Sequence, residues 1–141
     1  MPRNIKIRNI LLGTTQIALA ALFVFAGGFK LVASPEALAQ GPVVLPAGFL
    51  RFIGLAELLG GIGLVGPSLV RARRWVAPLA AWGLAVIMAG ATILSALAMG
   101  AAAALFPLVV GLLTVAVAIG RGPDLAIRNS VRRASAASVS L

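Results

Sequence analysis

Three ionisable side chains lie within or beside apolar segments of this chain and could form a polar site: Lys30, Arg51 and Glu57. Glu57 is the only acidic residue inside any of the apolar runs. A carboxyl near the middle of a bilayer is rare and costly, and such groups usually serve a proton, an ion or a ligand. The function of this protein therefore depends largely on what Glu57 faces.

Lys30 and Arg51 are the candidate partners of Glu57. Lys30 ends the first apolar run, and Arg51 begins the second on the same side of the membrane. Arg51 is six residues from Glu57, which is about 9 Å along and roughly 120° around one helix, so these two cannot pair well. Lys30 comes from another helix and is the better partner. We expect all three residues to line a polar pocket in the outer half of the protein. The alternative for Lys30 or Arg51 taken alone is that its side chain extends to the outer lipid headgroups.

Glycines flank Glu57 on its own helix. At a rotation of about 100° per residue, Gly54 and Gly61 fall on the same side as Glu57. Bare backbone there either lets a neighbouring helix approach closely or leaves a groove for a ligand. Two alternatives stay open. Either the glycines form a packing seam across which Glu57 makes a hydrogen bond, or they border a pocket that the buried Glu57 carboxyl lines. The predicted ligand-binding residues are Glu57, Lys30, Arg51, Gly54 and Gly61.

The chain contains no Cys and no His, and Tyr is also absent. Disulfides, catalytic thiols, haem imidazoles, iron–sulfur thiolates and ordinary zinc sites therefore cannot be built from it. Any redox role would need electrons carried by a bound small molecule or by a partner. The sequence favours a protein that is not an enzyme by itself, with no catalytic residues, no metal site and no built-in cofactor.

The elements that position these residues are membrane spans. The chain has 141 residues, of which 61% are hydrophobic and 11% charged, and its mean hydropathy of +1.09 exceeds that of soluble domains. Unsatisfied backbone groups cannot face lipid, so the spans must be helices, and short connections favour an all-α, antiparallel four-helix bundle. Apolar runs long enough to cross the bilayer lie at about 10–32, 47–65, 76–99 and 102–120.

Shorter segments surround these spans. We expect a basic amino-terminal segment at 1–9, a short outer helix near 34–40 that begins at a capping Ser34, and a basic tail at 121–141. The first apolar run exceeds the ~7–15 residues of a secretory signal core, so we expect it to remain as a span.

The charges indicate how the chain crosses the membrane. The 12 Lys and Arg outnumber the 3 Asp and Glu, for a net charge of +9. In a soluble protein this excess would suggest nucleic acid, but here the basic residues cluster at 3–8, 71–74 and 121–133, beside the apolar runs. By the positive-inside rule, both termini are expected in the cytoplasm, where these residues attract anionic lipid headgroups.

Residues 25–30, 51–57, 60–67 and 78–91 resemble the DoxX-like family of small bacterial membrane proteins, and the similarity covers roughly residues 10–120. A phenylalanine-rich end of the first helix with Lys30, followed by Arg51 and Glu57 on a glycine-rich second helix, carries this resemblance. It implies four transmembrane helices and a multi-pass protein of the bacterial inner membrane.

Some members of that family resemble or accompany subunits of membrane oxidoreductases, including a thiosulfate:quinone enzyme. The resemblance implies an accessory subunit that binds a quinone-like or other lipidic molecule beside Glu57, or that anchors a soluble redox partner at its basic face. One alternative is a small transporter or channel that uses Glu57 as a proton or cation site, although one acid per chain is a sparse pathway. Another is a purely structural assembly protein, including a homo-oligomer.

Overall fold

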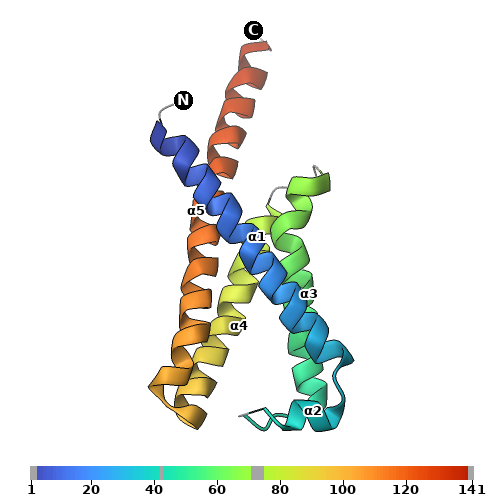
Figure 1. Cartoon of the computed structure of the whole chain (residues 1–141). Coiled ribbons are helices and arrows are strands. Elements are labelled where there is room, and N and C mark those ends of the chain that lie inside the picture. The colour runs from blue at the N-terminus through green and yellow to red at the C-terminus, as the bar shows by residue number, and fades with distance from the viewer. Residues whose placement is uncertain (1–2, 42, 71–74, 140–141) are drawn as a thin grey trace.

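The computed structural model describes residues 3–41, 43–70 and 75–139. Within these residues, four helices are long and apolar enough to cross a membrane, which confirms the prediction of a helical membrane protein. The basic segment 71–74 lies outside the described residues. The helices are α1 (Arg3–Val32), α2 (Pro35–Ala39), α3 (Ala47–Val70), α4 (Val76–Met99) and α5 (Ala101–Val139) (Figure 1).

Three helices, α1, α3 and α5, are longer than the apolar runs that predicted them. α1 begins at Arg3, before the run that starts near residue 10, and α3 continues to Val70, beyond the run that ends near residue 65. α5 continues to Val139 although its uncharged run ends at Gly120. Apolar composition marks the part of a helix that crosses the bilayer, whereas the helix itself continues wherever helix-forming residues such as Ala and Arg extend the hydrogen-bonded backbone. Both ends of the chain project from the same end of the molecule (Figure 1).

The connections at the opposite end are short. α4 and α5 are joined by Gly100 alone, whose φ of +90° is a conformation that glycine adopts without strain. The Ser34 cap of α2 is confirmed, since the Ala37 N–H donates to Ser34 Oγ at 3.2 Å. Hydrogen bonds from its own backbone N–H and from Ser34 lower the pKa of the exposed Glu36 below its ordinary value.

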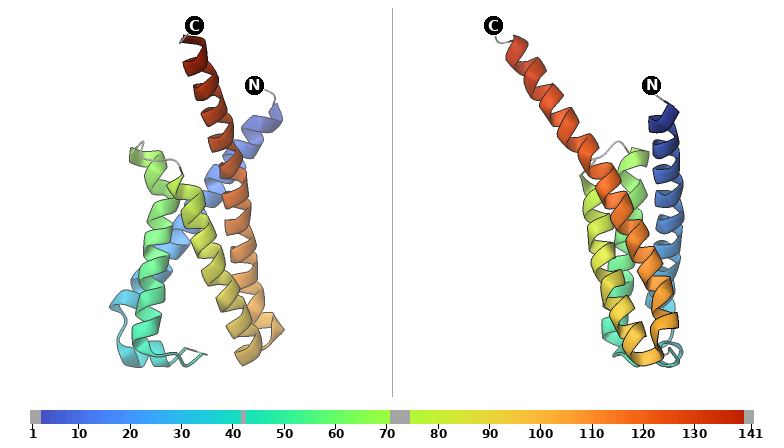
Figure 2. Two further views of the ribbon diagram at one scale, coloured as in Figure 1. Left: turned by 180° about the vertical axis from the view of Figure 1, so that it is seen from behind. Right: turned by 90° about the vertical axis from the view of Figure 1, so that its left-hand side faces the viewer.

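The helices pack as two pairs, α1 with α3 and α4 with α5, and α3 also packs against α4. Large buried side chains from all four helices form the core, namely Leu19, Phe23, Leu64, Leu84 and Val117. α1 crosses α5 near the end of the molecule that carries the termini, and the two pairs diverge toward the end that carries α2 (Figures 1 and 2). The core therefore joins the two pairs in the half of the molecule nearer the termini. In the half nearer α2 the two pairs diverge.

α1 and α3 touch through their backbones. A Cβ added to Gly54 would lie 2.7 Å from Lys30 Cβ and 3.0 Å from the Gly27 carbonyl oxygen, and one added to Gly27 would meet the Gly54 carbonyl oxygen. Helices approach this closely only where both lack side chains. Because Lys30 follows Gly27 by three residues and Glu57 follows Gly54 by three, the same crossing brings these two charged side chains together.

Candidate functional site

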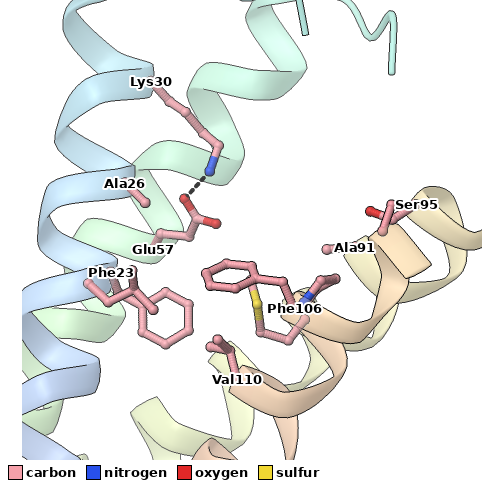
Figure 3. A pocket seen from close by; sticks show the side chains of 12 residues that line it. Phe23, Ala26, Lys30, Glu57, Ala91, Ser95, Phe106 and Val110 are labelled. Atoms are coloured by element: carbon pink, nitrogen blue, oxygen red, sulfur yellow. Dashed lines mark hydrogen bonds and ion pairs between the residues drawn. The ribbon is translucent and has the colours of Figure 1, made fainter. Parts of the chain in front are cut away.

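Lys30 and Glu57 form an ion pair between the last turn of α1 and the middle of α3. Lys30 Nζ donates to Glu57 Oε2 at 2.5 Å (Figure 3). Glu57 is 3% exposed, whereas the Lys30 side chain is 26% exposed. The sequence-based choice of Lys30 as the partner of Glu57 is therefore confirmed, and the carboxylate is sheltered inside the protein.

The ion pair lies in the wall of a cavity between the two helix pairs. The cavity is partly open and has a volume of about 290 Å³. Figure 3 shows the Glu57 carboxylate at its edge, with the Phe23 and Phe106 rings below it and Ser95 on the far side. Lys30 and Glu57 are the charged residues of an otherwise mostly apolar lining, which comprises Leu22, Phe23, Ala26, Lys30, Glu57, Met88, Ala91, Ser95, Ala103, Phe106, Pro107 and Val110.

The other three predicted site residues lie elsewhere. Arg51 is exposed on α3 and does not line this cavity, so the expected pocket of three charged residues contains two of them. The rotation of roughly 120° along one helix turns Arg51 away from Glu57. Gly54 and Gly61 pack against α1, and a Cβ on Gly61 would lie 2.9 Å from Val24 Cγ2. Both glycines therefore form part of the packing seam.

Sequence reasoning missed the opposite wall of the cavity. Met88 and Ser95 come from α4, and Phe106 and Pro107 come from α5. Phe106 is 66% exposed although it lines the cavity, which places its ring at the opening. In the sequence these residues look like ordinary packing or hydrogen-bonding groups of a span, and only the arrangement of the helix pairs brings them opposite Glu57.

A second polar cluster links three helices closer to the end that carries the termini. Gln16 on α1 is 3% exposed. Its Nε2 donates to the Leu64 carbonyl oxygen on α3, and its Oε1 accepts from Arg121 Nε on α5 at 2.9 Å. We call these groups the Gln16 cluster. It lies outside the cavity and ties α1 to α3 and α5 where the helices converge.

The site can orient a small ligand but offers little catalytic chemistry of its own. An ammonium donates up to three hydrogen bonds and a carboxylate only accepts them, so the pair presents both functions at one point of an apolar wall. Within the described ranges, no three acidic, His or Cys residues lie together as a metal site would need. The arrangement suits a mostly apolar molecule that carries a carbonyl or hydroxyl group.

Comparison with known proteins identifies the family. Residues 14–117 match the DoxX-like family, which covers most of the chain and includes every residue that lines the cavity. Arg121 lies beyond the matched segment. No curated protein and no solved structure matches the chain. The resemblance carried by the Lys30 and Glu57 segments is thus confirmed, and the protein belongs to the DoxX-like family.

Proposed function

We propose that this protein is a non-catalytic accessory subunit of a membrane oxidoreductase system and binds a quinone-like or other lipidic molecule beside Glu57. One observation carries the proposal: an ion pair with a buried carboxylate supplies the charge in a mostly apolar, partly open cavity within the spans. Proteins orient apolar ligands in this way, with many hydrophobic contacts and a few polar groups that fix the ligand head.

The two charged groups suit both redox forms of a quinone. Lys30 Nζ already donates to Glu57, and its remaining N–H groups can donate to a quinone carbonyl. The Glu57 carboxylate can accept from the hydroxyl of the reduced form. A flat head group placed between Phe23 and Phe106 would gain ring contacts, and an isoprenoid tail would leave past Phe106. The electrons would be exchanged between the bound molecule and a partner protein.

The charge distribution supports the orientation. We place the protein in the bacterial inner membrane as an antiparallel four-helix bundle with both termini in the cytoplasm. The basic residues of 3–8 and those at Arg121, Arg132 and Arg133 belong to the two helices that project from the same end of the molecule (Figures 1 and 2). That face fits anionic lipid headgroups or an acidic surface of a soluble redox partner, and nucleic acid is not among the partners we propose.

We expect Glu57→Gln to lose bound quinone. The carboxamide of Gln keeps one acceptor oxygen but carries no negative charge, so the Lys30 ammonium loses its ionic partner and the ligand head loses one acceptor oxygen. Affinity should therefore fall roughly tenfold. The measurement is native mass spectrometry of protein released from nanodiscs that contain an isoprenoid quinone. Glu36→Gln changes an exposed carboxyl outside the cavity and should retain the quinone of the parent.

Ala91→Phe tests the same site without touching the ion pair. Ala91 is half-buried and lines the cavity, so a phenyl ring there should exclude the ligand while Lys30 and Glu57 stay paired. If Glu57→Gln and Ala91→Phe both bind quinone as the parent does, the proposed site is wrong. A proton flux in liposomes that needs Glu57, together with no bound quinone in the parent, would support the transporter alternative instead.

A further inference from the structure

We propose that Arg121 and the amino-terminal turns of α1 form a binding site for the phosphate group of an anionic phospholipid. The site would lie in the leaflet at the end of the molecule that carries both termini. It is separate from the cavity beside Glu57 and does not depend on what that cavity binds.

The guanidinium of Arg121 is held in place from one side. Its Nε donates to Gln16 Oε1 at 2.9 Å, and the Gln16 side chain is fixed in turn by its hydrogen bond to the Leu64 carbonyl oxygen. A Cβ added to Gly13 would lie 3.8 Å from Arg121 Nη2, so the guanidinium rests over a residue that has no side chain. Within the described residues, Gln16 is the hydrogen-bond partner of Arg121, and this bond uses one of five N–H donors.

The depth of Arg121 matches that of a lipid headgroup. The uncharged run of α5 ends at Gly120, so Arg121 is the first charged residue after the fourth span, where such a segment meets the membrane surface. Trp75 immediately precedes α4 and is exposed, as is common for aromatic residues at this boundary. A phosphate in this leaflet would therefore lie level with the guanidinium.

The first turns of α1 supply the second wall. Helical geometry places Asn9 within about 20° of Gln16 around α1, and it places Lys6 and Arg8 roughly 80° to either side. All residues from Arg3 to Leu11 are exposed, so no other described element covers this face. Beyond their crossing, α1 and α5 diverge (Figure 2). A ligand between them would meet Arg121 from one helix and Asn9 from the other, between two cations.

The chemistry of these groups favours phosphate. A guanidinium presents parallel N–H donors that match two oxygens of a phosphate, and basic pockets between transmembrane helices bind anionic headgroups. The first 32 residues contain no acidic residue, and the one acidic residue of α5 is Asp124, three positions after Arg121. A free phosphate ion has the same chemistry, but a phospholipid is already held at this depth by its acyl chains.

The test compares two lipid compositions. The full chain, Arg121→Gln and Arg133→Gln are placed in nanodiscs of phosphatidylcholine with or without phosphatidylglycerol, and the melting temperature and lipids retained in native mass spectrometry are measured. We expect phosphatidylglycerol to stabilise the parent and remain bound to it, and Arg121→Gln to bind it roughly tenfold more weakly. Arg133 is exposed further along α5, so Arg133→Gln should behave as the parent.

For each variant, the melting temperature with phosphatidylglycerol is compared with the melting temperature without it. This comparison removes any general loss of stability that Arg121→Gln causes in both lipid compositions. Asn9→Leu should also weaken retention, because it removes the proposed donor without changing charge. Equal retention by the parent and Arg121→Gln would overturn the site, and so would equal losses in Arg121→Gln and Arg133→Gln, which would indicate diffuse attraction to a charged surface. Equal stabilisation of the parent by inorganic phosphate in phosphatidylcholine alone would overturn the lipid assignment.

Discussion

Gly27→Ala should lower the free energy of unfolding by about 3 kcal/mol, the upper end of the usual cost of overpacking. A Cβ at this position would lie 2.6 Å from the Leu58 backbone nitrogen and would also meet the Gly54 carbonyl oxygen. Backbone atoms in the middle of a helix cannot turn aside as a flexible side chain can, so α1 and α3 would have to separate. The measurement is equilibrium unfolding in mixed detergent micelles, followed by circular dichroism.

Gly28→Ala is the matched control, one residue further along the same helix. A Cβ there has nothing within 4 Å, and alanine favours the helix over glycine by roughly 0.5–1 kcal/mol. The two substitutions should therefore change stability in opposite directions. If both variants unfold at the same detergent concentration, the close backbone contact between α1 and α3 is wrong.

Lys30→Met should cost about 3 kcal/mol of stability. Methionine keeps most of the length of the side chain, so the main loss is the cation that faces Glu57 at 2.5 Å. Removing one member of a buried ion pair leaves an uncompensated charge, which typically costs about 3–5 kcal/mol, and we take the lower end because Lys30 is 26% exposed. The same unfolding measurement in micelles applies.

A double substitution separates lost charge pairing from lost packing. Adding Glu57→Met to Lys30→Met removes the unpaired carboxylate, and two apolar side chains of similar volume often replace a buried pair without net cost. The double variant should therefore regain most of the stability that Lys30→Met loses. A double variant as unstable as Lys30→Met would show that packing of the lysine stem, and not its charge, holds the helices together.

The spans and the ion pair were predictable because each depends on a local property. Apolar runs of sufficient length predict membrane helices, and the spacing of Arg51 and Glu57 along one helix excludes their pairing. Lys30 was then the remaining cation at a similar depth, and the structure places it against Glu57. Helix ends were less predictable, because α5 continues past the apolar run to Val139.

The rest of the site depends on how separate helices meet. Phe106 and Ser95 face Glu57 only because the α4–α5 pair lies beside the α1–α3 pair, and no spacing within either segment indicates this. The same holds for Gln16 and Arg121, which are 105 residues apart in the chain and 2.9 Å apart at their bonded atoms. Gly54 and Gly61 were predicted to line a site but pack against α1. Their spacing could not decide between these roles, because it is the same for a packing seam and for a groove.

The partly open cavity within the spans determines how its occupant would arrive. Every residue of its lining belongs to a helix apolar enough to lie among acyl chains, and Phe106 in that lining is exposed, so a lipidic occupant could enter past Phe106 from the hydrocarbon. A ligand would reach it by lateral diffusion in two dimensions. Occupancy would then follow the mole fraction of the ligand among the surrounding lipids, and a modest intrinsic affinity would suffice for a molecule that the bilayer itself concentrates.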